Sequence, residues 1–311
     1  MIELEHVTKK YGATVALKDV SLRAPGGRIT GLLGRNGAGK TTALNLMTGY
    51  FPPDEGKVLV DGMDLAKQPR ECRRRIGYLP EKPPLYDEMT VTDYLKFVCD
   101  LREVLPREKN RHVSEIVEIC ALSEVRDRII GHLSKGTRQR VGIAQALCGN
   151  PDILILDEPT IGLDPMQVVE IRDLIRALGK EHTILFSSHI LSEVQQLCSR
   201  VLILHEGQLI RAFDMDSVDS GGPFRLRLRA AGREEDILPA VRSLPCVRQA
   251  EAMPMKEKGV TELCIRGLER DERGLMTDQL FRLLAAMDAP IRYLAPERDD
   301  LEAVFLEATS S

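Results

Sequence analysis

Short apolar runs alternate along the first two thirds of the chain with stretches in which apolar residues recur every three or four positions. The runs predict buried β-strands, and the amphipathic stretches predict helices. Strands that alternate with helices are typical of an α/β fold built on a largely parallel sheet. The clearest predicted strands cover residues 29–33, 153–156, 183–187 and 201–204.

This pattern stops near residues 214–223, where the sequence is polar and rich in turn-forming residues. We therefore predict a first domain over 1–215, a linker over 216–223 and a second domain over 224–311. Strand and helix patterns in the second domain follow in the order βαββαβ, which predicts a small α+β domain of ferredoxin-like arrangement. Its predicted elements are strand 224–230, helix 234–243, strands 247–253 and 260–266, helix 275–288, strand 291–295 and a short amphipathic helix 301–306.

The first strand of the second domain alternates apolar residues with Arg225, Arg227 and Arg229. Alternate residues of a strand point to opposite faces, so the three arginines share one face. The favoured interpretation is a half-buried strand with a solvated polar face. Contact of the arginines with a partner, a lipid headgroup or a regulatory anion is the alternative.

Composition and charge exclude several classes of protein. The chain has 311 residues, 43% of them hydrophobic, and its formal net charge is −4, so generic nucleic-acid binding is disfavoured. No apolar run approaches the ~20 residues of a membrane span, and the N-terminus lacks a secretory signal, so we expect a cytoplasmic location. The 7 cysteines form no CxxC pair, which favours a packing role over disulfides or zinc.

A phosphate-binding motif, G-x-x-x-x-G-K-T, begins at Gly34, directly after a predicted strand and before a predicted helix. Gly37 and Gly39 allow the backbone to turn its N–H groups toward a phosphate, and the helix adds its positive dipole end. Lys40 would neutralise phosphate oxygens, and the Thr41 hydroxyl would ligate Mg²⁺. The predicted phosphate-binding residues are Gly34, Arg35, Asn36, Gly37, Ala38, Gly39, Lys40, Thr41 and Thr42.

A second motif is the apolar strand that ends in Asp157 and Glu158. Adjacent strand residues point in opposite directions, so the two carboxylates would have different roles. We expect Asp157 to face the Mg²⁺ shell and Glu158 to polarise a water for attack on the γ-phosphate. The alternative is a solvated end of the strand.

Residues 133–140, Leu-Ser-Lys-Gly-Thr-Arg-Gln-Arg, resemble the signature of the nucleotide-binding subunits of ATP-binding cassette (ABC) transporters. The resemblance covers residues 1–214 and implies a P-loop ABC ATPase domain with a mixed sheet and a helical signature subdomain. It also implies that Ser134, Lys135 and Gly136 contact the γ-phosphate held by the opposite subunit. One signature and one P-loop in a chain imply a dimer with two shared ATP sites.

Other positions match the family in order along the chain. Tyr11 resembles the aromatic residue that stacks on adenine, 162–164 resembles the loop that crosses the dimer, and His189 resembles the switch that contacts the γ-phosphate. Taken alone, Tyr11 and His189 would be read as ordinary core or surface residues. Glu81 stands where many members have glutamine, and its carboxylate can still ligate Mg²⁺. Together with the Leu-Ser-Lys-Gly signature, Glu81 is similar to the branch that pairs with ABC-2 type permeases.

The resemblance thus implies an ATPase subunit that uses ATP and Mg²⁺, with Lys40, Glu158 and His189 as its catalytic residues. It would form a homodimer, or pair with a second ATPase subunit, at the cytoplasmic face of the membrane without spanning it. There it would drive a separately encoded ABC-2 type permease, often an exporter. The alternative is an ABC-type ATP-dependent switch or scaffold that is not coupled to transport, although no second cassette or coiled-coil insertion is visible.

Overall fold

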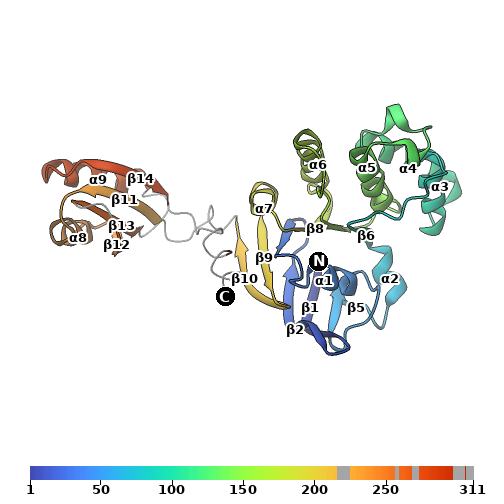
Figure 1. Cartoon of the computed structure of the whole chain (residues 1–311), viewed down its shortest axis with the longest axis horizontal. Helices are drawn as coiled ribbons and strands as arrows, with labels where there is room; N and C mark the ends of the chain where they lie inside the picture. Colours follow the sequence, from blue (N-terminus) through green and yellow to red (C-terminus); the bar gives the residue numbers. More distant parts are fainter. Residues whose placement is uncertain (216–224, 256–258, 268–272, 297–304, 306–311) are drawn as a thin grey trace. The chain divides into compact units, whose positions relative to one another are not determined.

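The computed structural model describes residues 1–215, 225–255, 259–267, 273–296 and 305. Within these residues the chain forms two compact units, one over Met1–Asp214 and the other inside Met215–Leu306 (Figure 1). Each unit has a hydrophobic core of its own. The predicted linker, 216–223, lies outside the described residues, and so does the predicted helix 301–306 except for Phe305.

Among the described residues, six strands form the central sheet of the first unit. All neighbouring pairs are parallel except the edge strand β10, which runs antiparallel to β9. Every residue of β3, β7 and β8 is buried, which explains their largely apolar sequences. Because parallel strands end at the same edge, the loops that follow these strands meet there. The order is β10 (Gln208–Asp214), β9 (Arg200–His205), β3 (Ile29–Leu33), β8 (Thr183–Ser188), β7 (Ile153–Asp157) and β6 (Ile76–Leu79).

A second sheet of the first unit is antiparallel, and helix α1 (Lys40–Met47) packs against strands of both sheets. Leu44 and Met47 of this helix share one core with Leu4 of the antiparallel sheet and Leu202 of the central sheet. This packing fixes α1, and with it the loop that precedes the helix. The order of the antiparallel sheet is β2 (Thr14–Ala24), β1 (Ile2–Tyr11), β4 (Glu55–Val60) and β5 (Met63–Asp64).

A helical region, coloured in greens in Figure 1, extends from the β6 side of the central sheet. Thr90 caps its first helix, because the Thr90 hydroxyl accepts a hydrogen bond from the Asp93 N–H at 3.1 Å. Gly77 of β6 lets helix α5 approach the sheet, since a Cβ there would lie 2.0 Å from the Ala146 carbonyl oxygen. The helices of this region are α3 (Val91–Leu101), α4 (Pro106–Ile119) and α5 (Lys135–Leu147), with 3-10 turns at Ser123–Val125 and Ile130–His132.

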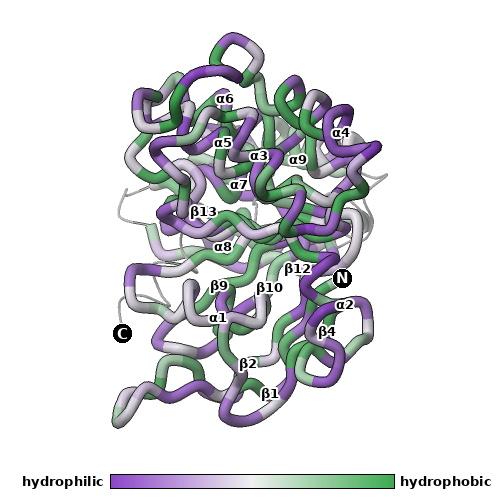
Figure 2. The backbone as a smooth tube through the Cα atoms, turned by 90° about the vertical axis from the view of Figure 1, so that its right-hand side faces the viewer, coloured by the Kyte–Doolittle hydropathy of each residue, from purple (hydrophilic) through white to green (hydrophobic). Residues whose placement is uncertain are grey.

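Three further helices flank the central sheet: α2 (Pro69–Arg74), α6 (Pro165–Leu178) and α7 (Leu191–Leu197). Figure 2 shows many hydrophilic positions along α4. Strand β9 is hydrophobic between its ends, Arg200 and His205. Hydrophobic stretches of the helices are short throughout. Within the part of the chain that the structure describes, no helix combines the length and apolar character of a membrane span.

The second unit has the predicted element order, with an antiparallel sheet and two helices among its described residues. Leu226 and Leu228 are buried against Ile237 and Leu280, as the alternating sequence predicts. The arginine face is more enclosed than a solvated face, because Arg227 and Arg229 lie over the buried carboxylate of Glu262. The sheet order is β12 (Val247–Met253), β13 (Val260–Gly267), β11 (Arg225–Ala231) and β14 (Ile291–Pro296), with helices α8 (Glu234–Arg242) and α9 (Arg273–Ala286).

Candidate functional site

The loop between β3 and α1 depends on its glycines. Gly37 and Gly39 have φ values of 84° and 102°, a backbone region that favours glycine. At Gly39 a Cβ would lie 2.8 Å from the Ala16 carbonyl oxygen, and at Gly34 it would lie 2.5 Å from that of Leu204. The sequence motif therefore forms a tight loop that is held between β2 and the end of β9.

A cavity of about 510 Å³ opens beside this loop, and we call it the loop pocket. Its walls include the predicted residues Arg35, Asn36, Gly37, Gly39, Lys40, Thr41, Thr42, Glu81 and Glu158. Gly34 and Ala38 shape the loop without lining the pocket. Sequence reasoning missed Thr14, Val15, Ala16, Ile161, Glu206 and Gly207, which also line it.

Lys40 is buried in the wall of the loop pocket, with 6% of its surface exposed. Its Nζ donates to the Gly34 carbonyl oxygen at 2.7 Å and lies 3.2 Å from Glu158 Oε1. A buried ammonium needs such partners, because removal from water disfavours an unpaired charge. The structure thus places the predicted phosphate-binding cation and the predicted catalytic carboxylate in direct contact.

Asp157 ends β7 beneath the loop pocket and is almost fully buried. Its Oδ1 accepts a hydrogen bond from the Ser187 hydroxyl at 2.6 Å, whereas its Oδ2 has no hydrogen-bond partner. Burial raises the pKa of Asp157, and the Ser187 and Thr41 hydroxyls oppose that rise. An unpartnered carboxylate oxygen beside a threonine hydroxyl matches the oxygen ligands that a hard divalent cation prefers.

The described residues contain no group of three or more histidine, cysteine, aspartate or glutamate side chains arranged to hold a metal ion. A cation here would therefore take one or two carboxylates and a hydroxyl from the protein and complete its shell with phosphate or water. Mg²⁺ is commonly held in this way in phosphate-transferring proteins. The oxygens of Thr41, Glu81 and Asp157 fit that kind of site.

Glu158 follows β7 with φ at 47°, a left-handed conformation that is uncommon for a residue with a side chain. Its N–H donates to the Ser187 hydroxyl at 2.9 Å, and His189 Nδ1 donates to its Oε2 at 2.8 Å. The different positions of Asp157 and Glu158 arise from this turn after the strand, in addition to the alternation that the sequence predicts. The turn brings Glu158, Lys40 and His189 together.

The predicted signature residues lie elsewhere in the unit. Ser134 caps α5, because its hydroxyl accepts from the Thr137 N–H at 3.2 Å. A Cβ at Gly136 would lie 2.5 Å from the Gln167 side chain, so glycine allows α5 to approach α6. The Lys135 ammonium lies against Gly162, where a Cβ would be only 2.2 Å away.

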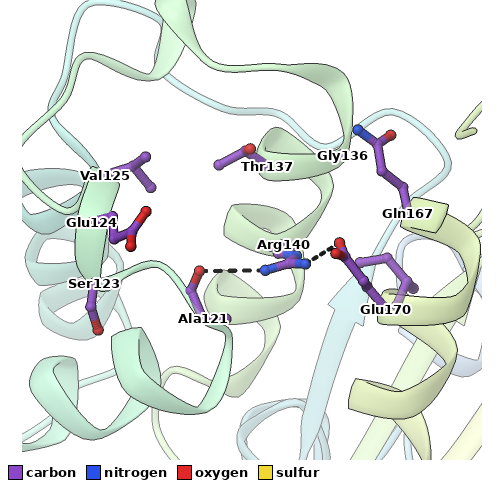
Figure 3. A pocket seen from close by; sticks show the side chains of 10 residues that line it. Ala121, Ser123, Glu124, Val125, Gly136, Thr137, Arg140, Gln167 and Glu170 are labelled. Carbon is purple, nitrogen blue, oxygen red and sulfur yellow. Dashed lines mark hydrogen bonds and ion pairs between the residues drawn. The ribbon is translucent and has the colours of Figure 1, made fainter.

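Gly136 also lines a second cavity of about 540 Å³ between α5, α6 and the turn around residues 121–125 (Figure 3). Arg140 crosses this cavity, forming an ion pair with Glu170 of α6 and donating to the Ala121 carbonyl oxygen. The signature therefore contacts the loop after Glu158 and not the loop pocket of its own chain.

Tyr11 is also absent from the walls of the loop pocket. It ends β1, is 47% exposed and packs edge to face against Phe51 with ring centroids 5.8 Å apart. Exposed aromatic surface of this kind can stack on a base. Its proposed contact with adenine stays a prediction.

Comparison with known proteins gives one family. The sequence model of that family, described as ABC transporter, matches residues 17–161. The chain is 39% identical over 218 residues to the bacitracin transport ATP-binding protein BcrA of Bacillus licheniformis, with 70% of each chain covered. It is 36% identical over 218 residues to the lipopolysaccharide export system ATP-binding protein LptB of Haemophilus influenzae, covering 68% of this chain and 89% of LptB.

A solved structure agrees with these relatives. It is the dimeric post-hydrolysis state of the ATP-binding cassette MJ0796 bound to ADP and Pi, with a TM-score of 0.63 and 26% identity. The similarity covers 69% of this chain and 99% of that one.

The chain belongs to the ABC transporter family, as the signature predicts. It is an ATP-binding, ATP-hydrolysing subunit that dimerises and pairs with a separately encoded transmembrane permease. The mixed α/β cassette fold of the first unit is confirmed by the same comparisons.

Proposed function

We propose that the loop pocket binds Mg²⁺–ATP and that Glu158 is the residue that polarises the attacking water. The observation that carries this proposal is the contact of Glu158, on the pocket wall, with both Lys40 and His189. In this reading Lys40 and the N–H groups of residues 34–42 hold the phosphates, and His189 contacts the γ-phosphate. Thr41, Asp157 and Glu81 hold Mg²⁺, which offsets phosphate charge when bound, and Tyr11 stacks on adenine.

Each ATP is shared between two subunits in this proposal. Ser134, Lys135 and Gly136 lie outside the loop pocket of their own chain, so an intramolecular role at its phosphates is not supported. A second subunit supplies these residues instead, at the capped N-terminal end of α5. The loop over 162–164 touches Lys135, so it lies next to the proposed contact between the two subunits.

The test is Glu158→Gln, with the exposed Glu181→Gln as its matched control. The amide keeps the shape of Glu158 but loses the charge that orients water, so kcat should fall at least about 100-fold, the ordinary contribution of a general base. ATP affinity should be kept, and sedimentation with ATP should show a stable dimer. A Glu158→Gln protein that hydrolyses ATP at the normal rate would remove Glu158 from this role.

The proposed partner is an ABC-2 type permease, and the proposed direction of transport is export. Support comes from the Leu-Ser-Lys-Gly signature with Glu81, and from the similarity to BcrA and to LptB of an export system. The subunit would then act at the cytoplasmic face of the membrane, as a peripheral protein. Purification of the permease that binds this chain, followed by sequencing of the permease, tests the assignment.

We further propose that residues 1–215 are the ATPase domain, 216–223 a linker and 224–311 an accessory domain of the ferredoxin-like class. The support is the order β12-β13-β11-β14 with all pairs antiparallel, the order that a βαββαβ chain takes in that class. Each unit buries its own apolar residues. The accessory domain therefore has the core of an independent folding unit.

A further inference from the structure

A buried carboxylate, that of Glu193, lies outside the walls of the loop pocket. Glu193 lies in the first turn of α7 and is 7% exposed. Its Oε2 accepts two hydrogen bonds of 2.9 Å, one from the Thr160 hydroxyl and one from the Ser188 hydroxyl. No ion pair to Glu193 occurs among the residues that the structure describes.

The two hydroxyls come from the two segments that carry the proposed catalytic side chains. Thr160 belongs to the loop that begins at Glu158, and Ser188 directly precedes His189. The Ser188 hydroxyl also accepts from the Ile190 N–H at 3.0 Å, so hydrogen bonds hold the backbone on both sides of His189. Glu193 thus joins the loop of the catalytic carboxylate to the strand end of the histidine.

A carboxylate is well suited to this link because it only accepts hydrogen bonds. Both hydroxyls must therefore donate to Glu193, and the lone pairs of Ser188 stay available for the Ile190 N–H. Keeping a charged group buried costs free energy unless its hydrogen bonds are made, so a break in either bond is disfavoured.

We propose that Glu193 is a positioning residue that fixes Glu158 and His189 in a single arrangement through Thr160 and Ser188. The inference rests on the proposed catalytic roles of Glu158 and His189. Glu193 lies outside the walls of the loop pocket, so its effect is on the geometry of catalysis and not on nucleotide binding. A 1 Å displacement of catalytic groups can lower turnover about 100-fold.

The experiment measures steady-state ATPase activity and ATP affinity of the full chain carrying Glu193→Ala or Glu193→Gln. Glu193→Ala should lower kcat at least about tenfold while KM and ATP affinity stay within about twofold of wild type. Glu193→Gln should restore most of the rate, because one amide oxygen can accept both hydroxyls. Gln195→Ala, an exposed position of the same helix, is the control for changes to α7.

Thr160→Val and Ser188→Ala keep the proposal testable if Glu193→Ala fails to fold. Each single change should lower kcat without changing KM. In a protein that already carries both changes, Glu193→Ala should cause little further loss of kcat, because the three residues act as one unit. Normal kcat in Glu193→Ala, or a change confined to KM, would overturn the inference. Glu158→Gln, measured in the same experiment, distinguishes failure of this inference from failure of the proposed function. If Glu158→Gln retains full turnover, the proposed role of Glu158 is wrong.

Discussion

At the scale of single residues, Asp157 shows a conflict between stability and function. Its Oδ2 is buried without a hydrogen-bond partner, and burial raises the pKa of the carboxyl group. For an acid whose pKa is raised on folding, the folded protein is most stable while the acid is protonated. Its stability decreases as the pH rises through that pKa. Without a bound cation, the ionised Asp157 therefore lowers the stability of the fold.

We predict that Asp157→Asn stabilises the nucleotide-free protein while reducing its Mg²⁺-dependent ATPase activity. Removing the buried charge should add about 1 kcal/mol to the free energy of unfolding near neutral pH. That gain corresponds to a rise in Tm of about 2–4 °C for a unit of this size. Thermal denaturation between pH 4 and 8 checks this, because the gain should shrink as the pH falls and wild-type Asp157 becomes protonated. A lower Tm at every pH would contradict the prediction.

At the scale of elements, the strands and loops of the candidate site could be predicted from the sequence because their signals are local. An apolar run followed by glycines or carboxylates marks β3 and β7, and the same residues form the loop pocket. Most of the wall residues that the sequence analysis missed, 14–16 and 206–207, are distant in sequence from the predicted motifs and match no motif themselves. Some of these residues contribute backbone atoms to the surroundings of the loop, such as the Ala16 carbonyl oxygen beside Gly39.

Other features could not be predicted because they depend on long-range packing. The sequence around Glu193 contains no motif that predicts its role. That role becomes visible only when the pairing of β7 with β8 brings Thr160 and Ser188 to the same carboxylate. Likewise, the sequence shows the glycine of the signature but not that its neighbour is Gln167 of α6. The positive φ of Glu158 arises where the chain turns away from β7.

The separation between the signature and the loop pocket leads to a prediction for helix α5. Ser134→Arg should leave ATP binding by each chain intact but prevent ATP-dependent dimerisation, because a bulky cation would occupy the end of α5. A mixed dimer of Ser134→Arg and Lys40→Ala subunits contains one composite site with both halves intact. ATPase measurements on each variant and on the mixture should show partial recovery of activity. A verified mixed dimer that stays inactive would contradict the shared site.

At the scale of the whole molecule, the chain forms two compact units, and the proposed ATP site belongs to one of them. Every described residue that lines the loop pocket or the cavity beside Gly136 lies in the first unit. Among the residues that the structure describes, these core clusters of the two units share no residue. We therefore expect the first unit to keep the proposed ATP site when the second unit is removed.

We predict that a protein truncated after Met215 folds and binds ATP with the affinity of the full chain. None of the described residues of the second unit lines the loop pocket, so loss of this unit should affect dimer content without nucleotide, or stimulation by the permease. Isothermal titration with ATP and sedimentation without it are the measurements. If the truncated protein is folded but does not bind ATP, the boundary of the functional unit is wrong.

The contact between Lys40 and Glu158 bears on whether Glu158 can act on water before ATP binds. A lysine ammonium has three protons to donate, and here they are directed to the Gly34 carbonyl oxygen and to the Glu158 carboxylate. If the loop pocket holds the phosphates as proposed, an arriving γ-phosphate would compete for the same protons and draw Lys40 away from Glu158. The Glu158 carboxylate would then become available to a water molecule only when the bond to be broken is already in place. Binding of the substrate would in this way release the base that hydrolyses it.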